Sequence, residues 1–359
     1  MREPSFRTLL LASLAAFAFA AHAFAQEKTV QFGVLGLFHP KEIVLEPYGN
    51  QALLVSGIGS GDSAKVVING EPNKRRLVFR AEKNGVTVNG KSAEKWIATA
   101  RDGGAAEFAL TVPGKLRRVY RGEFAVELRR NELVAIVGIE LETAVASIVA
   151  AEMNERAPLE ALKAQAVATR SFLAAGGRHS EFEFCDSTHC QFLKSPPAAS
   201  SRVWSAVAAT RGWVMTFESK PLAALYSSRC GGRTRTLHDA GYDSIGAKGA
   251  AYPYYAVECP WCRKHPLEWQ RTFDAEHRPP APGDERQRIA TVRQWGWSAL
   301  PGDDFKATEE NGGWRINGHN AGHGIGMCQY GAIGMAASGI GYSEILAHYY
   351  PNTSLSRLR

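Results

Sequence analysis

Hydrophobic positions with helical spacing are most regular between residues 141 and 173. The apolar residues that recur at intervals of three and four are Leu141, Val145, Ile148 and Val149. This spacing places them on one face of a helix, and the next position on that face is Glu152. Pro158 suits the first turn of a second helix, which Gly176 and Gly177 would end. The pattern therefore predicts two helices with a break at residues 154–158.

Glu152 is a candidate general acid because of its place on this face. A carboxylate directed at apolar side chains is costly to ionise, so its pKa rises. With a raised pKa the carboxyl stays protonated at neutral pH, which is the state that a general acid needs. The alternative is that Glu152 lies at a frayed helix end and points to water.

The region before these helices has the pattern of β structure. Short runs rich in β-branched and aromatic residues occupy 29–35, 42–45, 65–68, 76–79 and 86–88. Asn-Gly pairs at 69–70, 84–85 and 89–90 separate several of them. Longer runs at 118–128 and 133–137 lead directly into the first helix. The pattern predicts an α+β fold with a β-rich N-terminal part, in which the first hundred residues show no recognisable chemistry.

The first 25 residues have the form of a secretory signal. Arg2 and Arg7 provide the charged start, residues 9–21 the apolar run, and Ala23-Phe24-Ala25 a cleavage site. The apolar run is short for a membrane span, and no second candidate span follows. The full chain has 359 residues, of which 45% are hydrophobic. Without the signal it is still long enough to form two domains. We expect an exported protein with no stable membrane span after cleavage.

Charge narrows the choice of partner. The formal net charge is +7, and removing two arginines and Glu3 with the signal lowers it to +6. A basic exported protein favours an anionic polymer as partner. No nucleic-acid motif is present, so nucleic acid is not expected.

The first of two cysteine groups has the composition of a metal site. Two imidazoles and two thiols lie within twelve residues: His179, Cys185, His189 and Cys190. Such a set can close a tetrahedral structural zinc site. In an exported protein, a disulfide between Cys185 and Cys190 is the alternative.

The second group is the C-x-x-C pair of Cys259 and Cys262. A redox pair is disfavoured because no thioredoxin-like βαβ pattern surrounds it. A disulfide from Cys230 to Cys259 or Cys262 is the preferred interpretation. A second zinc site, with Cys230 and His265 as further ligands, is the weaker alternative, and Cys328 is expected simply to be buried.

The segment from residue 318 to 334 is dense in glycine but does not fit a nucleotide-binding loop. Glycines at this density let the backbone approach a ligand closely. His323, Gln329 and Tyr330 would then offer hydrogen bonds to sugar hydroxyls. A last helix is predicted to begin at Ser343 as N-cap and to end before Pro351.

Five motifs together resemble the SpoIID/LytB family of bacterial cell-wall proteins. They are Ala151-Glu152-Met153, the run 159–167 with Arg170, Cys185-Asp-Ser-Thr-His-Cys-Gln191, residues 226–234 and residues 322–332. The resemblance covers roughly residues 115–352 in matching order. One departure is Asn154, where the family usually has proline. The implied division is a signal peptide at 1–25, a β-rich module at 26–114 and a SpoIID/LytB-like catalytic domain at 115–359.

The resemblance implies a lytic transglycosylase whose catalytic acid is Glu152. Its zinc-binding relatives use His and Cys clusters of the kind found at 179–190. The expected substrate is the peptidoglycan glycan strand, stripped of stem peptides, in the periplasm or the cell wall. The residues expected to orient it are Gln165, Arg170, Tyr226, His323 and Gln329, with Arg170 facing a substrate carboxylate. The alternative from the same family is a non-catalytic enhancer of a partner amidase.

The chemistry itself favours a transglycosylase over a hydrolase. Hydrolytic glycosidases need two carboxylates, and Glu155, Glu160 and Asp186 are unconvincing partners for Glu152. No nucleophile elbow is present, and a zinc with four protein ligands has no open position for water. In a lytic transglycosylase the C6 hydroxyl of muramic acid replaces water and yields a 1,6-anhydromuramyl end. One glutamate suffices for that reaction.

Overall fold

The computed structural model describes residues 28–59, 65–68, 76–83, 85–101, 105–242, 249–281, 284–296 and 298–358. The predicted export signal and the Asn-Gly pair at 69–70 lie outside these ranges, as does Asn84. No helix in the described part of the chain combines the length and hydropathy that crossing a membrane requires.

The N-terminal half of the chain folds into one twelve-stranded sheet among the described residues. Its strands are β1 (Thr29–Val34), β2 (Glu42–Pro47), β3 (Leu53–Ile58), β4 (Lys65–Ile68), β5 (Leu77–Glu82), β6 (Gly85–Val88), β7 (Lys91–Ala93), β8 (Lys95–Ala100), β9 (Ala106–Val112), β10 (Leu116–Arg129), β11 (Glu132–Glu140) and β12 (Phe184–Cys185). The path runs β12-β1-β11-β10-β9-β2-β5-β6-β7, while β8 joins β10 to β3 and β4. The predicted α+β class is confirmed.

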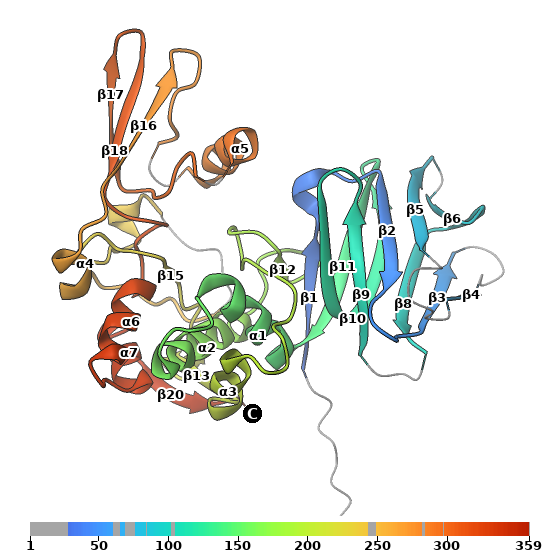
Figure 1. Cartoon of the computed structure of the whole chain (residues 1–359), viewed down its shortest axis with the longest axis horizontal. Coiled ribbons are helices and arrows are strands. Elements are labelled where there is room, and N and C mark those ends of the chain that lie inside the picture. The colour runs from blue at the N-terminus through green and yellow to red at the C-terminus, as the bar shows by residue number, and fades with distance from the viewer. Residues whose placement is uncertain are drawn as a thin grey trace, which may run out of the picture.

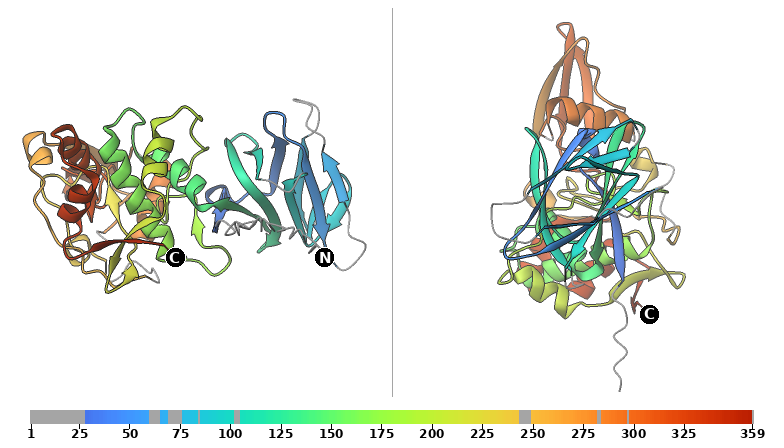
Figure 2. Two further views of the ribbon diagram at one scale, coloured as in Figure 1. Left: turned by 90° about the horizontal axis from the view of Figure 1, so that it is seen from below. Right: turned by 90° about the vertical axis from the view of Figure 1, so that its right-hand side faces the viewer.

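The sheet folds around an aromatic core. Phe79 packs edge-on against Trp96 and Phe124, with ring centroids 6.4 and 5.5 Å apart. Trp96 is fully buried and donates its indole N–H to the Val86 carbonyl at 2.8 Å. Buried Tyr and Trp side chains need such a partner for their polar atom. This body forms one end of the molecule, and the helices lie at the other (Figure 2).

β10 passes between two sets of partners at Gly122. Before this residue β10 pairs with β9, and after it β10 pairs with β8 and β11. A Cβ at Gly122 would lie 2.0 Å from the Gly138 carbonyl oxygen. Glycine therefore permits the close approach at which the sheet turns.

The two predicted helices are confirmed, together with their break. α1 (Leu141–Glu152) follows β11 directly, and the Glu140 side chain caps it by accepting the backbone N–H groups of Glu142 and Thr143. α2 (Leu159–Ala174) begins after Pro158. Figure 1 shows both helices between the β body and the C-terminal segments.

The remaining elements follow α2 in the chain. They are α3 (Arg202–Ala209), β13 (Trp213–Phe217), β14 (Lys220–Pro221), β15 (Tyr226–Ser227), α4 (Pro260–Lys264), β16 (Trp269–Asp274), α5 (Glu285–Trp295), β17 (Phe305–Glu310), β18 (Gly313–Gly318), β19 (Met327–Cys328), α6 (Gln329–Ala337), α7 (Tyr342–Tyr349) and β20 (Ser354–Arg357). Of these, α3, β13, β14, α6 and α7 pack against α2. β16, β17 and β18 form a small separate sheet that projects from the molecule (Figure 1). β15 pairs in parallel with β19 and so joins two distant motifs.

The structure corrects three expectations. The predicted domain boundary at residues 114 and 115 falls in the turn before β10, yet the sheet continues to Glu140. The glycine-dense segment 318–334 was expected to bring its backbone close to a ligand, but from Gln329 onward it forms the start of α6. The last helix begins at Tyr342 with Gly341 as N-cap, so Ser343 is the second residue of the helix and not its cap.

Candidate active site

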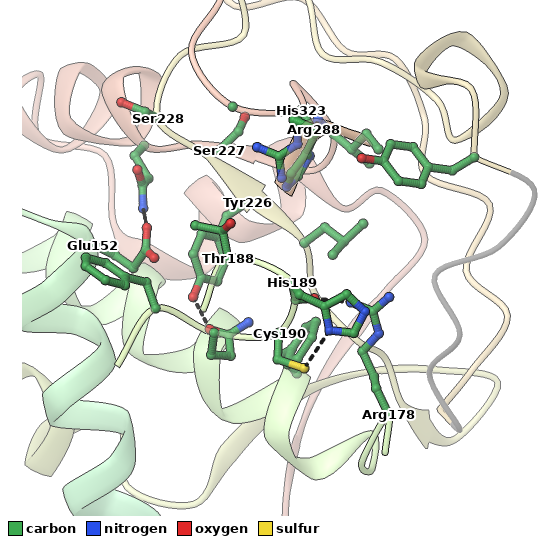
Figure 3. Close-up of a pocket in the computed structure, with 18 residues that line it drawn as sticks. Glu152, Arg178, Thr188, His189, Cys190, Tyr226, Ser227, Ser228, Arg288 and His323 are labelled. Atoms are coloured by element: carbon green, nitrogen blue, oxygen red, sulfur yellow. Dashed lines mark hydrogen bonds between the residues drawn. The ribbon is translucent and has the colours of Figure 1, made fainter. Parts of the chain in front are cut away.

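Glu152 ends α1 at the wall of a pocket of about 220 Å³. Met153, the C-cap, is extended, so the chain leaves the helix directly after the glutamate. Residues from α1, α2, β15, α5, α6 and the loops between them line this pocket (Figure 3): Glu152, Phe172, Arg178, Thr188, His189, Cys190, Gln191, Phe192, Leu225, Tyr226, Ser227, Ser228, Tyr242, Arg288, Gly322, His323, Ile325 and Gln329. The pocket brings together motifs that are up to 177 positions apart in the sequence.

Burial raises the pKa of the Glu152 carboxyl to about 7. A hydrogen bond from Gln329 and the charge of Lys194 act in the opposite direction and lower it. The net effect leaves a large share of the carboxyl protonated at neutral pH. That is the property expected of a general acid.

A chain of amides fixes the Glu152 carboxyl. Gln329, the first residue of α6, donates its side-chain N–H to Glu152 Oε2 at 3.3 Å and also lies 3.3 Å from Gln165 Oε1. Gln165 is fully buried in α2 and donates in turn to the Thr169 hydroxyl at 3.2 Å. Gln329 therefore contacts the acid directly, whereas Gln165 lies behind it and positions Gln329.

Tyr226 lies in the pocket wall beside the acid. Its hydroxyl donates to the Gln191 side-chain oxygen. Burial, and secondarily the charge of Glu152, raise the pKa of Tyr226 well above its usual value. The phenol therefore stays protonated as a hydrogen-bonding group.

His323 is held neutral in a glycine turn. Gly322 and Gly324 on either side adopt φ values of 84° and 75°, which favour glycine. The Ile325 N–H donates to His323 Nδ1 at 3.0 Å, so in the neutral ring Nε2 carries the proton. Burial lowers the pKa of His323 to about 4. His323 can therefore donate one hydrogen bond but carries no charge at neutral pH.

The pocket also contains two arginines that the sequence analysis missed, Arg178 and Arg288. Arg288 Nε lies 3.5 Å from Asp303 Oδ1, and the Tyr242 hydroxyl lies 3.4 Å from the other Asp303 oxygen. Arg288 and His323 lie side by side (Figure 3). Arg288 comes from α5, a polar stretch without a motif, so no local signal indicated its place.

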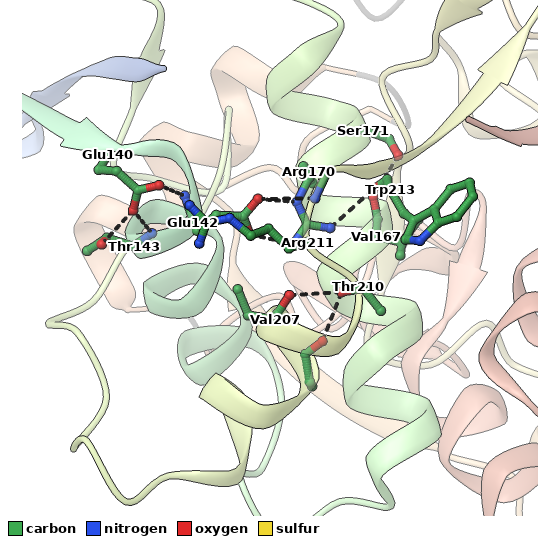
Figure 4. Close-up of polar contacts among 12 residues, drawn as sticks. Glu140, Glu142, Thr143, Val167, Arg170, Ser171, Val207, Thr210, Arg211 and Trp213 are labelled. Atoms are coloured by element: carbon green, nitrogen blue, oxygen red, sulfur yellow. Dashed lines mark hydrogen bonds and ion pairs between the residues drawn. The ribbon is translucent and has the colours of Figure 1, made fainter. Parts of the chain in front are cut away.

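The expectation that Arg170 faces the substrate is wrong. Arg170 is fully buried, and its guanidinium makes two hydrogen bonds to the Glu142 carboxylate, at 2.9 and 2.6 Å. A third hydrogen bond reaches the Trp213 carbonyl at 3.1 Å (Figure 4). Arg170 thus ties α2 to α1 and β13. Tyr330 likewise does not line the pocket, and Arg229 stacks on its ring at 3.8 Å.

Glu152 is the one acid among the described residues that line this pocket. The carboxylates weighed as its partners are engaged elsewhere. Glu155 accepts the Ser201 hydroxyl, Glu160 pairs with Lys163, and Asp186 pairs with Arg118 at 3.0 Å. The arrangement therefore offers one carboxyl for acid–base chemistry.

The ligand atoms of His179, Cys185, His189 and Cys190 all lie within 4.8 Å of one another. His179 Nε2 is 3.1 Å from Cys190 Sγ, and Cys185 Sγ is 3.6 Å from His189 Nδ1. Two thiols and two imidazoles at this spacing fit the donor set and size of a tetrahedral zinc site. The cluster lies beside the pocket, because His189 and Cys190 also belong to its wall (Figure 3).

All six cysteines are free. The predicted disulfide from Cys230 to Cys259 or Cys262 is therefore wrong, and the alternative Cys185–Cys190 disulfide is also absent. Cys328 is buried as expected, and it also lies among the other three cysteines of its region.

Comparison with known proteins confirms the family resemblance. Residues 129–217 match the sequence model of the SpoIID family, described as stage II sporulation protein. This segment contains α1, α2 and the His/Cys cluster.

Two relatives extend the similarity well beyond that segment. The chain is 28% identical over 326 residues to stage II sporulation protein D of Bacillus amyloliquefaciens, covering 78% of this chain and 90% of that protein. It is 27% identical over 285 residues to the protein of the same name in Bacillus subtilis, covering 65% and 79%. A shorter match, 46% identical over 57 residues, is to the amidase enhancer of Bacillus subtilis and covers 14% of this chain and 8% of that protein.

Proposed function

We propose that the protein is an exported peptidoglycan lytic transglycosylase in which Glu152 is the general acid. The observation that carries the proposal is a single carboxyl in the pocket, with a pKa raised to about 7. A hydrolytic glycosidase would need a second carboxylate there.

The proposed reaction needs one proton donor that later accepts a proton. Protonated Glu152 gives its proton to the glycosidic oxygen as the bond from that oxygen to the muramic C1 breaks. The C6 hydroxyl of the same muramic residue then attacks C1 and passes its proton to the Glu152 carboxylate. The products are a free hydroxyl on the leaving sugar and a 1,6-anhydromuramyl end, and no water is consumed.

Neighbouring residues hold the acid and the sugar. Gln329 restricts the orientation of the carboxyl, and Gln165 restricts Gln329. The Tyr226 hydroxyl donates to Gln191, so its oxygen can accept a hydrogen bond from a sugar hydroxyl. His323 lines the same wall as a neutral ring that is hydrogen-bonded to the backbone of Tyr226. The removal of stem peptides leaves a lactyl carboxylate on each muramic residue. Arg288, which lines the pocket, replaces Arg170 as the candidate to bind it.

The His/Cys cluster would hold a structural zinc. With four protein ligands the metal would supply no chemistry to the reaction. It would fix the loop from His179 to Cys190, which carries Thr188 and leads to Gln191 in the pocket wall.

The relatives support a cell-wall or sporulation-related role. Two of them are named stage II sporulation protein D. Together with the signal-like N-terminus, they favour action outside the cytoplasm, in the periplasm or cell wall.

A second candidate function is enhancement of a cell-wall amidase without catalysis. The observation that favours it is the match over 57 residues to the Bacillus subtilis amidase enhancer. In that function Glu152 would be dispensable.

Amidase-treated peptidoglycan incubated in H₂¹⁸O tests the proposal. The expected products are anhydromuramyl ends without ¹⁸O, identified by mass spectrometry. Reducing ends that carry ¹⁸O would show a hydrolase instead. Absence of cleavage, combined with faster turnover by an added amidase, would support the enhancer function.

A further inference from the structure

We propose that a second group of four cysteines forms a structural zinc site, separate from the His/Cys cluster. The four are Cys230, Cys259, Cys262 and Cys328. All four are buried, with at most 2% of each side chain exposed. They are the second of the two metal-ligand groups found in the described part of the chain.

The four sulfur atoms converge as zinc ligands do. They all lie within 4.8 Å of one another, and the Sγ atoms of Cys262 and Cys328 are 3.5 Å apart. Around a tetrahedral zinc with Zn–S bonds of about 2.3 Å, sulfur atoms lie about 3.8 Å apart. The separations in the structure therefore match a shared central ion.

Two disulfides would account for this arrangement less well. A disulfide joins sulfur atoms in pairs at about 2 Å and places no requirement on a second pair. Here four thiols from three separate segments meet at one point, and all are free. A tetrahedral metal ion requires all four sulfur atoms to meet at one point, whereas two disulfide bonds do not.

Hydrogen-bond donors surround the sulfurs. The Gly331 N–H donates to Cys328 Sγ at 3.4 Å, and the Tyr349 hydroxyl lies 3.4 Å from Cys259 Sγ. Donors of this kind stabilise metal-bound thiolates. A Cβ at Gly331 would lie 2.6 Å from Cys259 Sγ and 1.9 Å from the Tyr349 oxygen. Gly331 therefore lets α6 approach the sulfur cluster closely.

The backbone after Cys230 also helps to bring the cysteines together. Gly231 and Gly232 adopt φ values of 77° and 118°, which favour glycine. The Cys259 N–H donates to the Gly232 carbonyl at 2.8 Å. The turn after Cys230 thus fixes the position of the C-x-x-C segment.

The proposed zinc site is connected to the pocket through one of its ligands, Cys328. Cys328 immediately precedes Gln329, whose side chain contacts Glu152. Cys328 also ends β19, which pairs with Tyr226 and Ser227 of β15. A zinc on Cys328 would hold the start of α6 and, if the proposed function is correct, the amide that orients the acid.

Metal analysis of the purified full chain tests the proposal directly. We expect two zinc ions per chain by elemental analysis and native mass spectrometry. Cys262→Ser should retain one zinc, and Cys190→Ser should also retain one by losing the ion of the other cluster. Each variant serves as the control for the other.

The wild-type chain gives a second readout that does not depend on folding of a variant. Peptide mapping after alkylation should show the four thiols protected until a chelator is added, and then all modified. A disulfide between any two of them, iron in place of zinc, or thiols that react without chelator would each overturn the proposal. Because these readouts do not involve peptidoglycan, they stand whether or not the chain cleaves glycan.

Discussion

At the scale of single residues, the site depends on the protonation state of Glu152. Burial raises its pKa to about 7, and the Gln329 hydrogen bond counteracts part of this rise by stabilising the carboxylate. The acid and its hydrogen-bond donor lie on separate helices: Glu152 ends α1, and Gln329 begins α6. The acid strength of the site is therefore adjustable through Gln329 without touching Glu152.

The pH dependence of kcat/KM follows from this balance. Because the acid must be protonated to act, kcat/KM should fall as the pH rises above about 7. Gln329→Leu removes the bond that favours the carboxylate, so the falling limb should move to higher pH. Gln270→Leu, on β16 and bonded to Asn317, is the matched control and should leave the profile unchanged. An unchanged profile in the Gln329 variant would show that this bond does not tune the acid.

Arg170 illustrates what the sequence could not predict at this scale. Its place in a motif indicated importance, but the partner Glu142 lies 28 positions away on the buried side of α1. Only the packing of α1 against α2 shows that the arginine is structural. Glu152, by contrast, was predictable, because helical spacing alone places it on the apolar face.

Removal of Arg170 should destabilise the fold rather than weaken substrate binding alone. Arg170→Met leaves the Glu142 carboxylate buried without its partner, at a cost of about 3–5 kcal/mol. Urea denaturation measures this loss. The double variant with Glu142→Gln should recover part of it, because the unpaired charge is then gone. A single variant within about 0.5 kcal/mol of wild type would contradict the structural role.

At the scale of elements, two loop segments contribute to the site together with residues from α1, α2, α5 and α6. The loop 178–193 carries the His/Cys cluster, and the segment 318–328 carries His323. The composition of the first loop was enough to predict its ligand group. The second cysteine group was predictable only in part: Cys230 was considered beside the C-x-x-C pair as the weaker alternative, but with His265 as the further ligand. Cys328, from a third and distant segment, carried no local signal of its place among the other three. The sequence also gave no sign that α6 begins at Gln329, since glycines at 331 and 334 argue against a helix.

Zinc bound to the first loop should stabilise the folded protein, and its loss should be measurable as a lower melting temperature. Cys190→Ser should release about one zinc per chain and lower the melting temperature together, because closing the shell stabilises the folded loop. Ser180→Ala, an exposed position in the same loop, is the control. Metal content unchanged by the cysteine substitution would contradict the assignment.

At the scale of the whole molecule, a β body, a helical layer and the C-terminal segments are joined in sequence order (Figure 1). The α+β class and most of the longer strands followed from alternation and turn residues. The boundary of the β body did not, because β10 and β11 follow the predicted boundary at residues 114 and 115 yet pair with the sheet. The net charge of +7 is a property of the whole molecule and affects which glycan it binds.

The basic balance predicts a preference for peptide-stripped glycan. Strands with free lactyl carboxylates should bind more tightly than strands that retain stem peptides, and the difference should shrink as salt screens the charges. Binding can be compared by sedimentation with the two insoluble glycans at low and high ionic strength. Arg288→Gln should reduce the preference, with Lys306→Gln on β17, an exposed residue that does not line the pocket, as control. Equal binding of both glycans at low salt would contradict this expectation.

The most direct measurement compares wild type with Glu152→Gln on amidase-treated peptidoglycan. Glutamine keeps the shape of the side chain and can still contact Gln329, but it cannot deliver a proton. The variant should fold and bind glycan as wild type does, while the release of anhydromuramyl products falls on the order of a hundredfold or more. Release at the wild-type rate would contradict the assignment of Glu152 as the catalytic acid and would favour the amidase-enhancer function.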